Sequence, residues 1–112
     1  MSYISDIRKK VGNDPVFMPL ASGIIMENNK ILLQKRTDDG TWAFHGGCLE
    51  LGETFEEALK REIKEELNVL INIGELIDTI EYDYPKFHLS MDCFWCEIIN
   101  IKELKLNGYL LI

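Results

Sequence analysis

Apolar residues recur every three or four positions over residues 54–67, which predicts an amphipathic helix. Thr54 and Glu57 form the capping-box pattern at its start, in which a hydroxyl and a carboxylate satisfy free amides of the first turn. A second, shorter apolar stripe over residues 3–11 is closed by Gly12, a common helix stop. The hydrophobic pattern therefore predicts one strong helix in the middle of the chain and a short one near its start.

The remaining apolar runs are short and are bounded by turn residues, which is typical of β-strands. Asn28-Asn29 and Asn107-Gly108 are turn signals, because Asn and Gly tolerate the left-handed conformation. The predicted strands are 16–27, 30–36, 69–73, 76–84, 89–99 and 109–112, with a short apolar stretch over 42–44. Strands around one strong helix predict an α+β fold in which the strands share a sheet.

A length of 112 residues predicts a single domain, 1–112, in which residues 1–14 form an N-terminal helical extension. No apolar run is long enough to span a membrane, and the charged start of the chain does not resemble a signal peptide. The odd number of cysteines, Cys48, Cys93 and Cys96, favours reduced thiols in the cytoplasm. Cys93 and Cys96 lie three apart on a predicted strand and so point to opposite faces, which argues against a zinc or redox pair.

The net charge is −7, from 12 Lys and Arg against 19 Asp and Glu. This acidic balance argues against a protein that binds the phosphate backbone of a nucleic acid. Residues 47–69 hold more than half of the imbalance, on one loop and helix. A divalent cation bound there would invert the local sign of the charge.

Three carboxylates of the central helix are unusually placed. Glu62 and Glu66 fall within the apolar arc, and Glu65 lies at its edge. One interpretation is that they form salt bridges or reach water at the helix edge. The other is that they converge on a hard divalent cation such as Mg²⁺, because carboxylates so close together repel one another unless a cation lies between them.

The residues around this helix resemble the Nudix box, G-x5-E-x7-R-E-U-x-E-E-x-G-U, where U is aliphatic. Gly47, Glu53, Arg61-Glu62-Ile63, Glu65-Glu66 and Val69 match, and Asn68 replaces the last Gly. The preceding Trp42-Ala43-Phe44-His45-Gly46-Gly47 is similar to the family's approach to the box, and residues 3–19 are similar to the start of MutT-like members. The chain thus resembles the Nudix hydrolase family over most of its length up to about residue 99.

The resemblance implies the Nudix fold, an α/β/α sandwich around a mixed sheet. It also implies metal-dependent hydrolysis of the pyrophosphate linkage in a nucleoside diphosphate derivative. Carried over by position, Glu62, Glu65, Glu66 and the Gly46 carbonyl would bind Mg²⁺ or Mn²⁺. Glu53 would pair with Arg61 in the catalytic centre, and Glu62 would deprotonate the attacking water.

Three departures from the family pattern qualify these expectations. Asn68 is expected to end the helix in the left-handed conformation at small cost. His45 stands where many relatives have Pro and is either a solvated loop residue or, with Trp42 and Phe44, a weak candidate for substrate contact. Relatives continue with another strand and usually a C-terminal helix, so the resemblance implies that this chain lacks the fold's last elements. Glu97 and Glu103 are candidates, by location alone, for the acid that relatives supply from that region.

Three function classes remain open at this point: a Nudix pyrophosphohydrolase, an impaired Nudix-fold nucleotide-binding or regulatory module, and a generic α+β interaction domain. The intact acidic helix favours the first. The partner expected is a small nucleoside diphosphate derivative, with no nucleic-acid polymer and no membrane. The apolar end of the chain is compatible with a homodimer.

Overall fold

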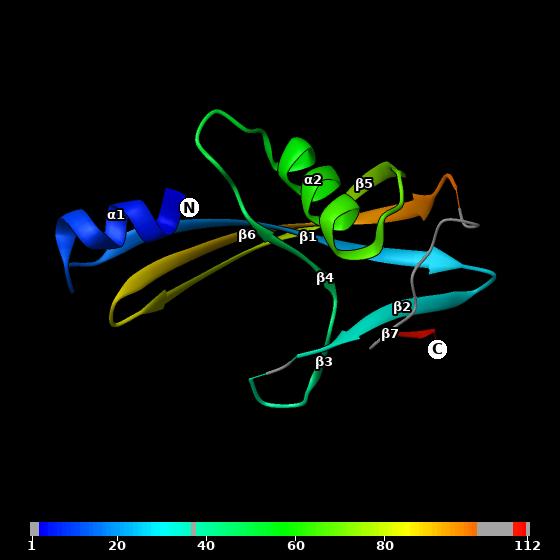
Figure 1. The fold of residues 1–112 in the computed structure, drawn as a ribbon, viewed down its shortest axis with the longest axis horizontal. Coiled ribbons are helices and arrows are strands. Elements are labelled where there is room, and N and C mark those ends of the chain that lie inside the picture. Colours follow the sequence, from blue (N-terminus) through cyan, green and yellow to red (C-terminus); the bar gives the residue numbers. More distant parts are fainter. Residues whose placement is uncertain (1–2, 37, 101–108, 112) are drawn as a thin grey trace.

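A computed structural model describes residues 3–36, 38–100 and 109–111 (Figure 1). Two helices and seven strands are present in this part of the chain. In order they are α1 (Tyr3–Val11), β1 (Val16–Glu27), β2 (Lys30–Lys35), β3 (Trp42–Ala43), β4 (His45–Cys48), α2 (Phe55–Leu67), β5 (Ile71–Tyr84), β6 (Phe87–Ile98) and β7 (Tyr109–Leu111).

The strands form one mixed sheet, centred on β1. Its main path has the order β3-β2-β1-β6-β5, while β4 also pairs with β1 and β7 pairs with β2. Only the pairing of β1 with β6 is parallel among these strands. The α+β class with a mixed sheet is therefore as predicted, and the predicted final strand is present over Tyr109–Leu111.

The β5–β6 hairpin differs from the prediction. Residues 71–84 form one strand, whereas the sequence analysis placed two strands with a break at Gly74 and Glu75. The pairing with β6 continues past this point through register shifts between Ile73 and Leu76 and between Leu76 and Asp78. Gly74 and Glu75 thus lie in the first of two β-bulges, which bend a strand without ending it.

The core lies where α2 packs on the sheet. Ala58, Leu59, Ile63 and Leu67 of the helix are fully buried against Ala21 and Ile25 of β1 and against neighbouring strands. Gly23 is part of this contact, because a Cβ there would lie 3.0 Å from the Cys96 Sγ and 3.3 Å from Leu59. The close approach of helix and sheet fixes which face of α2 is buried.

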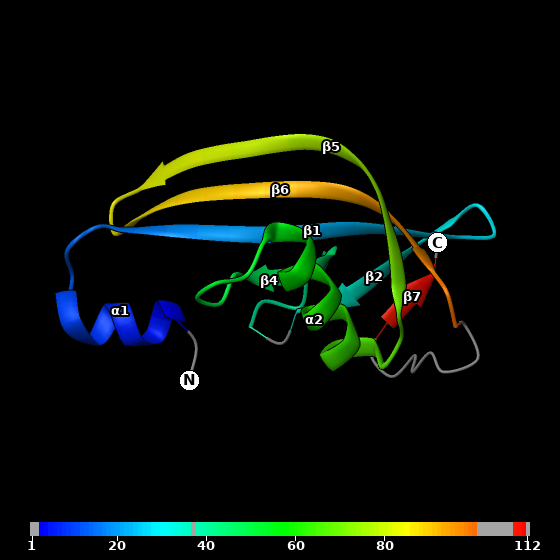
Figure 2. The same ribbon diagram turned by 90° about the horizontal axis from the view of Figure 1, so that it is seen from above.

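Figure 2 shows α1 beside one end of β1, near the tip of the β5–β6 hairpin, and α2 beside the middle of β1. Ile7 and Val11 of α1 line a cavity together with Pro19 of β1 and with Leu49 and Leu51 from the loop before α2. Among the described residues, no helix is long and apolar enough to cross a membrane.

Candidate active site

Two glycines of β4 allow the site to form. Gly46 and Gly47 pair with Ser22 and Ala21 of β1. A Cβ on Gly46 would collide with the Ala21 carbonyl oxygen, and a Cβ on Gly47 would lie 2.5 Å from the Glu62 Cδ. Gly46 therefore excludes any side chain, whereas a side chain at Gly47 would displace the Glu62 carboxylate, which lies directly against the backbone of β4.

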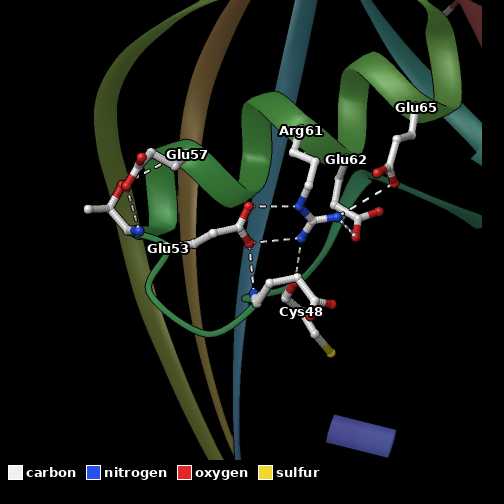
Figure 3. A network of polar contacts seen from close by, with 8 residues as sticks. Cys48, Glu53, Glu57, Arg61, Glu62 and Glu65 are labelled. Atoms are coloured by element: carbon white, nitrogen blue, oxygen red, sulfur yellow. Dashed lines mark hydrogen bonds and ion pairs between the residues drawn. The ribbon is translucent and has the colours of Figure 1, made fainter. Parts of the chain in front are cut away.

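The ion pair between Glu53 and Arg61, expected from the resemblance, is present (Figure 3). Arg61 Nε donates to Glu53 Oε2 at 2.7 Å and Nη2 donates to Oε1 at 3.0 Å, an arrangement that holds both groups in one plane. Nη2 also donates to the Cys48 carbonyl, and the Glu50 amide donates to Glu53. The guanidinium lowers the pKa of Glu53, and together these contacts hold the loop against the helix.

The same guanidinium lies between two further carboxylates, as Figure 3 shows. Arg61 Nη1 is 2.9 Å from Glu62 Oε1 and 3.5 Å from Glu65 Oε2. The Glu62 side chain is 21% exposed and that of Glu65 is 61% exposed, so the two differ in hydration. Removal from water raises the pKa of Glu62, against the opposing effect of Arg61. Glu62 therefore lies at the boundary of the core, as its place in the apolar arc predicts.

Glu66 lies one helical turn further on and contacts a histidine. Its Oε2 is 2.8 Å from His45 Nδ1. The Glu66 side chain is 22% exposed, whereas the imidazole is completely buried. The expectation of a solvated loop histidine is therefore wrong, because His45 begins β4 and pairs with Gly23.

The helix ends as the sequence predicts. Asn68 has φ 59° and ψ 35°, the left-handed conformation, and its amide donates to the Lys64 carbonyl. Thr54 and Glu57 make both hydrogen bonds of the capping box at the other end. These two caps set the length of α2 and so the positions of its glutamates.

The donor set suits a hard divalent cation. Glu62, Glu65 and Glu66 present carboxylate oxygens at one end of the helix surface, which is the ligand type that Mg²⁺ and Mn²⁺ prefer. Within the described ranges, no three acidic, His or Cys side chains yet form an ion-sized cluster. Arg61 Nη1 lies between Glu62 and Glu65, and Glu53 pairs with the other side of the guanidinium.

A cavity of about 230 Å³ adjoins the two glycines. Gln34, Arg36 and Phe44 line it, and sequence reasoning singled out only Phe44. Arg36 is a cation with an exposed side chain that pairs with Asp38 at 2.8 Å. Trp42 is 45% exposed and does not line this cavity. A larger cavity of about 450 Å³ lies around Trp95 and contains no residue of the box, so size alone does not locate the site.

Within the described residues, the acidic candidates outside the box, and the three cysteines, add nothing to this group of glutamates. Glu97 is exposed on β6 opposite Asn72, and Glu103 lies outside the described residues. Cys48, Cys93 and Cys96 are free thiols. Burial raises the pKa of Cys96 to about 12, so it stays a neutral thiol.

Comparison with known proteins supports this description. An 8-oxo-dGTP diphosphatase of Escherichia coli K12 is 37% identical over 83 residues, which cover 70% of this chain and 64% of the relative. An ADP-ribose pyrophosphatase of Methanocaldococcus jannaschii is 48% identical over 88 residues, or 74% of this chain and 52% of the relative. The chain thus spans between half and two thirds of the length of these relatives.

The fold also matches solved structures. The crystal structure of the C. elegans Ap4A hydrolase superposes with a TM-score of 0.69 at 21% identity, covering 85% of this chain and 79% of that one. A family model described as the NUDIX domain matches residues 18–105, which include the whole box and most of the sheet. The chain therefore belongs to the NUDIX domain family.

Proposed function

We propose that the chain hydrolyses the pyrophosphate linkage of a nucleoside diphosphate derivative with the help of Mg²⁺ or Mn²⁺. The placement of Glu62 carries this proposal. A carboxylate that is 21% exposed, lies against Gly47 and has two further glutamates on the same helix is costly for stability even with its ion pair to Arg61. Its position is explained if the carboxylates serve a cation and a reacting water.

Each residue has a role in this proposal. Glu62, Glu65 and Glu66 would hold the cation, with the Gly46 carbonyl as a further oxygen ligand. When bound, the cation neutralises charge on the diphosphate and lowers the pKa of an attacking water. Glu62 would accept the proton of that water. Glu53 keeps Arg61 in place, and Arg61 ties the loop over residues 48–53 to the helix.

The cavity beside Gly46 and Gly47 is our candidate for the nucleotide. Arg36 offers a charge for a phosphate, and Gln34 and Phe44 offer an amide and an aromatic ring for a base. The relatives are named for 8-oxo-dGTP and ADP-ribose, which both contain a nucleoside diphosphate. We therefore propose a nucleoside diphosphate derivative, a small molecule, as the substrate. The expected compartment is the cytoplasm.

A screen of nucleoside diphosphate derivatives with and without Mg²⁺ tests the proposal. Metal-dependent release of a nucleoside monophosphate or phosphate supports it. Thermal stabilisation by a nucleotide without turnover would support a binding module instead, and the absence of both responses would favour a generic interaction domain.

Glu62→Gln tests the assigned residue. We expect kcat to fall by about 10²–10⁴-fold because the general base is lost, with little change in the melting temperature. Glu56→Gln is the matched control, since it makes the same change at an exposed position of the same helix. Near-normal turnover in Glu62→Gln would remove Glu62 from its role.

A further inference from the structure

We propose that His45 is a positioning residue that holds the Glu66 carboxylate for cation binding. This inference rests on the proposed function, since it assigns a support to one of the proposed ligands. It concerns a position where this chain departs from the family pattern, and no role follows for His45 from the box itself.

The geometry of His45 is fixed from both sides. Its backbone lies in β4, opposite Gly23 of β1, so the strand pairing sets where the side chain starts. Its imidazole is 0% exposed, and its Nδ1 lies 2.8 Å from Glu66 Oε2. With Glu66 ionised, Nδ1 carries the hydrogen and donates it to the carboxylate. A rigid, buried donor thus points at one oxygen of Glu66 from the sheet.

A purely structural explanation of His45 is weaker. An apolar side chain could fill the same buried volume without bringing a polar ring out of water. The polar ring instead contacts a carboxylate that is itself 22% exposed and therefore open to solvent and to a ligand. Glu65, by contrast, is 61% exposed and lies 3.5 Å from Arg61 Nη1. The buried donor therefore holds one oxygen of the Glu66 carboxylate in a fixed direction.

Carboxylates that bind metals are commonly held by hydrogen bonds from residues behind them. Removal of such a support typically lowers metal affinity about 10–100-fold. The support raises metal affinity because a carboxylate that is already held in place loses less side-chain entropy when the ion binds. His45 would hold the Glu66 carboxylate in this way without contacting the ion or the substrate.

The test compares two substitutions in the full chain. His45→Leu fills the pocket without a donor, whereas His45→Asn keeps an N–H near the place of Nδ1. Binding of Mn²⁺ alone is measured by electron paramagnetic resonance of the free ion. We expect the dissociation constant to rise about 10–100-fold in His45→Leu and to be largely restored in His45→Asn. If His45→Leu does not fold, as judged by circular dichroism, His45→Phe replaces it.

A mutant cycle separates positioning from stability. In a Glu66→Gln background, the same His45→Leu substitution should leave Mn²⁺ affinity nearly unchanged, because the ligand it supports is already altered. In the hydrolysis assay, the defect of His45→Leu should appear as a raised metal requirement and should shrink at saturating Mg²⁺. A loss of kcat that persists at saturating metal would contradict positioning.

The failures of the two proposals are distinguishable. Wild-type Mn²⁺ affinity in His45→Leu or His45→Phe overturns the role of His45 and leaves the proposed function intact. If the wild-type protein itself binds no Mn²⁺ and hydrolyses no diphosphate, the proposed function fails, and the role of His45 fails with it.

Discussion

Two regions of the molecule contrast sharply: the contact of α2 with β4, and the outer part of the β5–β6 hairpin. In the first, Leu59, Ile63 and Leu67 are fully buried, and charged side chains lie directly beside them. In the second, every residue of β5 from Gly74 to Tyr84 is exposed although the strand is paired along its length. Both regions consist of hydrogen-bonded secondary structure, so what differs is the burial of side chains.

The contrast explains where the proposed chemistry lies. A carboxylate beside a packed core has few rotamers, and its charge is felt more strongly because water is partly excluded. Glu62, held between Gly47 and Arg61, has these properties. The hairpin also carries acidic groups near its tip, but Asp83 and Glu81 are exposed and are screened by water.

Contacts between aromatic side chains, rather than a buried core, stabilise the tip of the β5–β6 hairpin. Tyr82 and Tyr84 have ring centroids 4.7 Å apart, and Tyr84 stacks on Phe87 at 4.5 Å. Such contacts between aromatic side chains stabilise a sheet without a buried core. Figure 2 shows the hairpin tip near α1, away from the C-terminal half of α2 that carries the glutamates.

The largest expected effect is on the free energy of unfolding, when one apolar residue in each region is truncated to Ala. Leu59→Ala removes a fully buried side chain and should destabilise the protein by about 2–5 kcal/mol. Ile80→Ala removes a side chain that is 41% exposed and should cost under about 1 kcal/mol. Denaturant unfolding measures both, and equal losses would show that the hairpin is as well packed as the helix.

A smaller effect concerns His88 at the hairpin tip. Its Nδ1 contacts Asp83 and its Nε2 lies 3.6 Å from Glu81, both on β5, while its ring stacks on Phe17 of β1. The carboxylate of Asp83, followed by that of Glu81, raises the pKa of His88 in the folded protein. Protonated His88 therefore favours folding below its unfolded pKa of about 6.5, and this contribution is lost as pH rises through the higher folded pKa.

The measurement compares melting temperatures of wild-type protein and His88→Gln between about pH 5.5 and pH 9. The wild-type advantage should be greatest at the acidic end and small at the basic end. An advantage that is constant with pH would show that the stack on Phe17, rather than charge, explains the contact.

Local signals account for what could be predicted from sequence. The capping box, the glutamates within the apolar arc and the left-handed Asn68 depend on neighbours within one helix. The bulged course of β5 was missed because pairing with β6 outweighs Gly74 as a break. The burial of His45 was missed because it depends on the pairing of β4 with β1, which joins residues far apart in the chain. The cavity with Arg36 and Gln34 was missed for the same reason.

The most direct test of the central claim is a titration of ¹⁵N-labelled protein with substoichiometric Mn²⁺, followed by NMR. Paramagnetic broadening falls steeply with distance from the ion, so it maps the binding site. We expect the amides of Gly46, Gly47, Glu62, Glu65 and Glu66 to broaden first, while those of residues 78–90 in the hairpin remain sharp. Broadening centred on Asp83 and His88, or none near α2, would contradict the account.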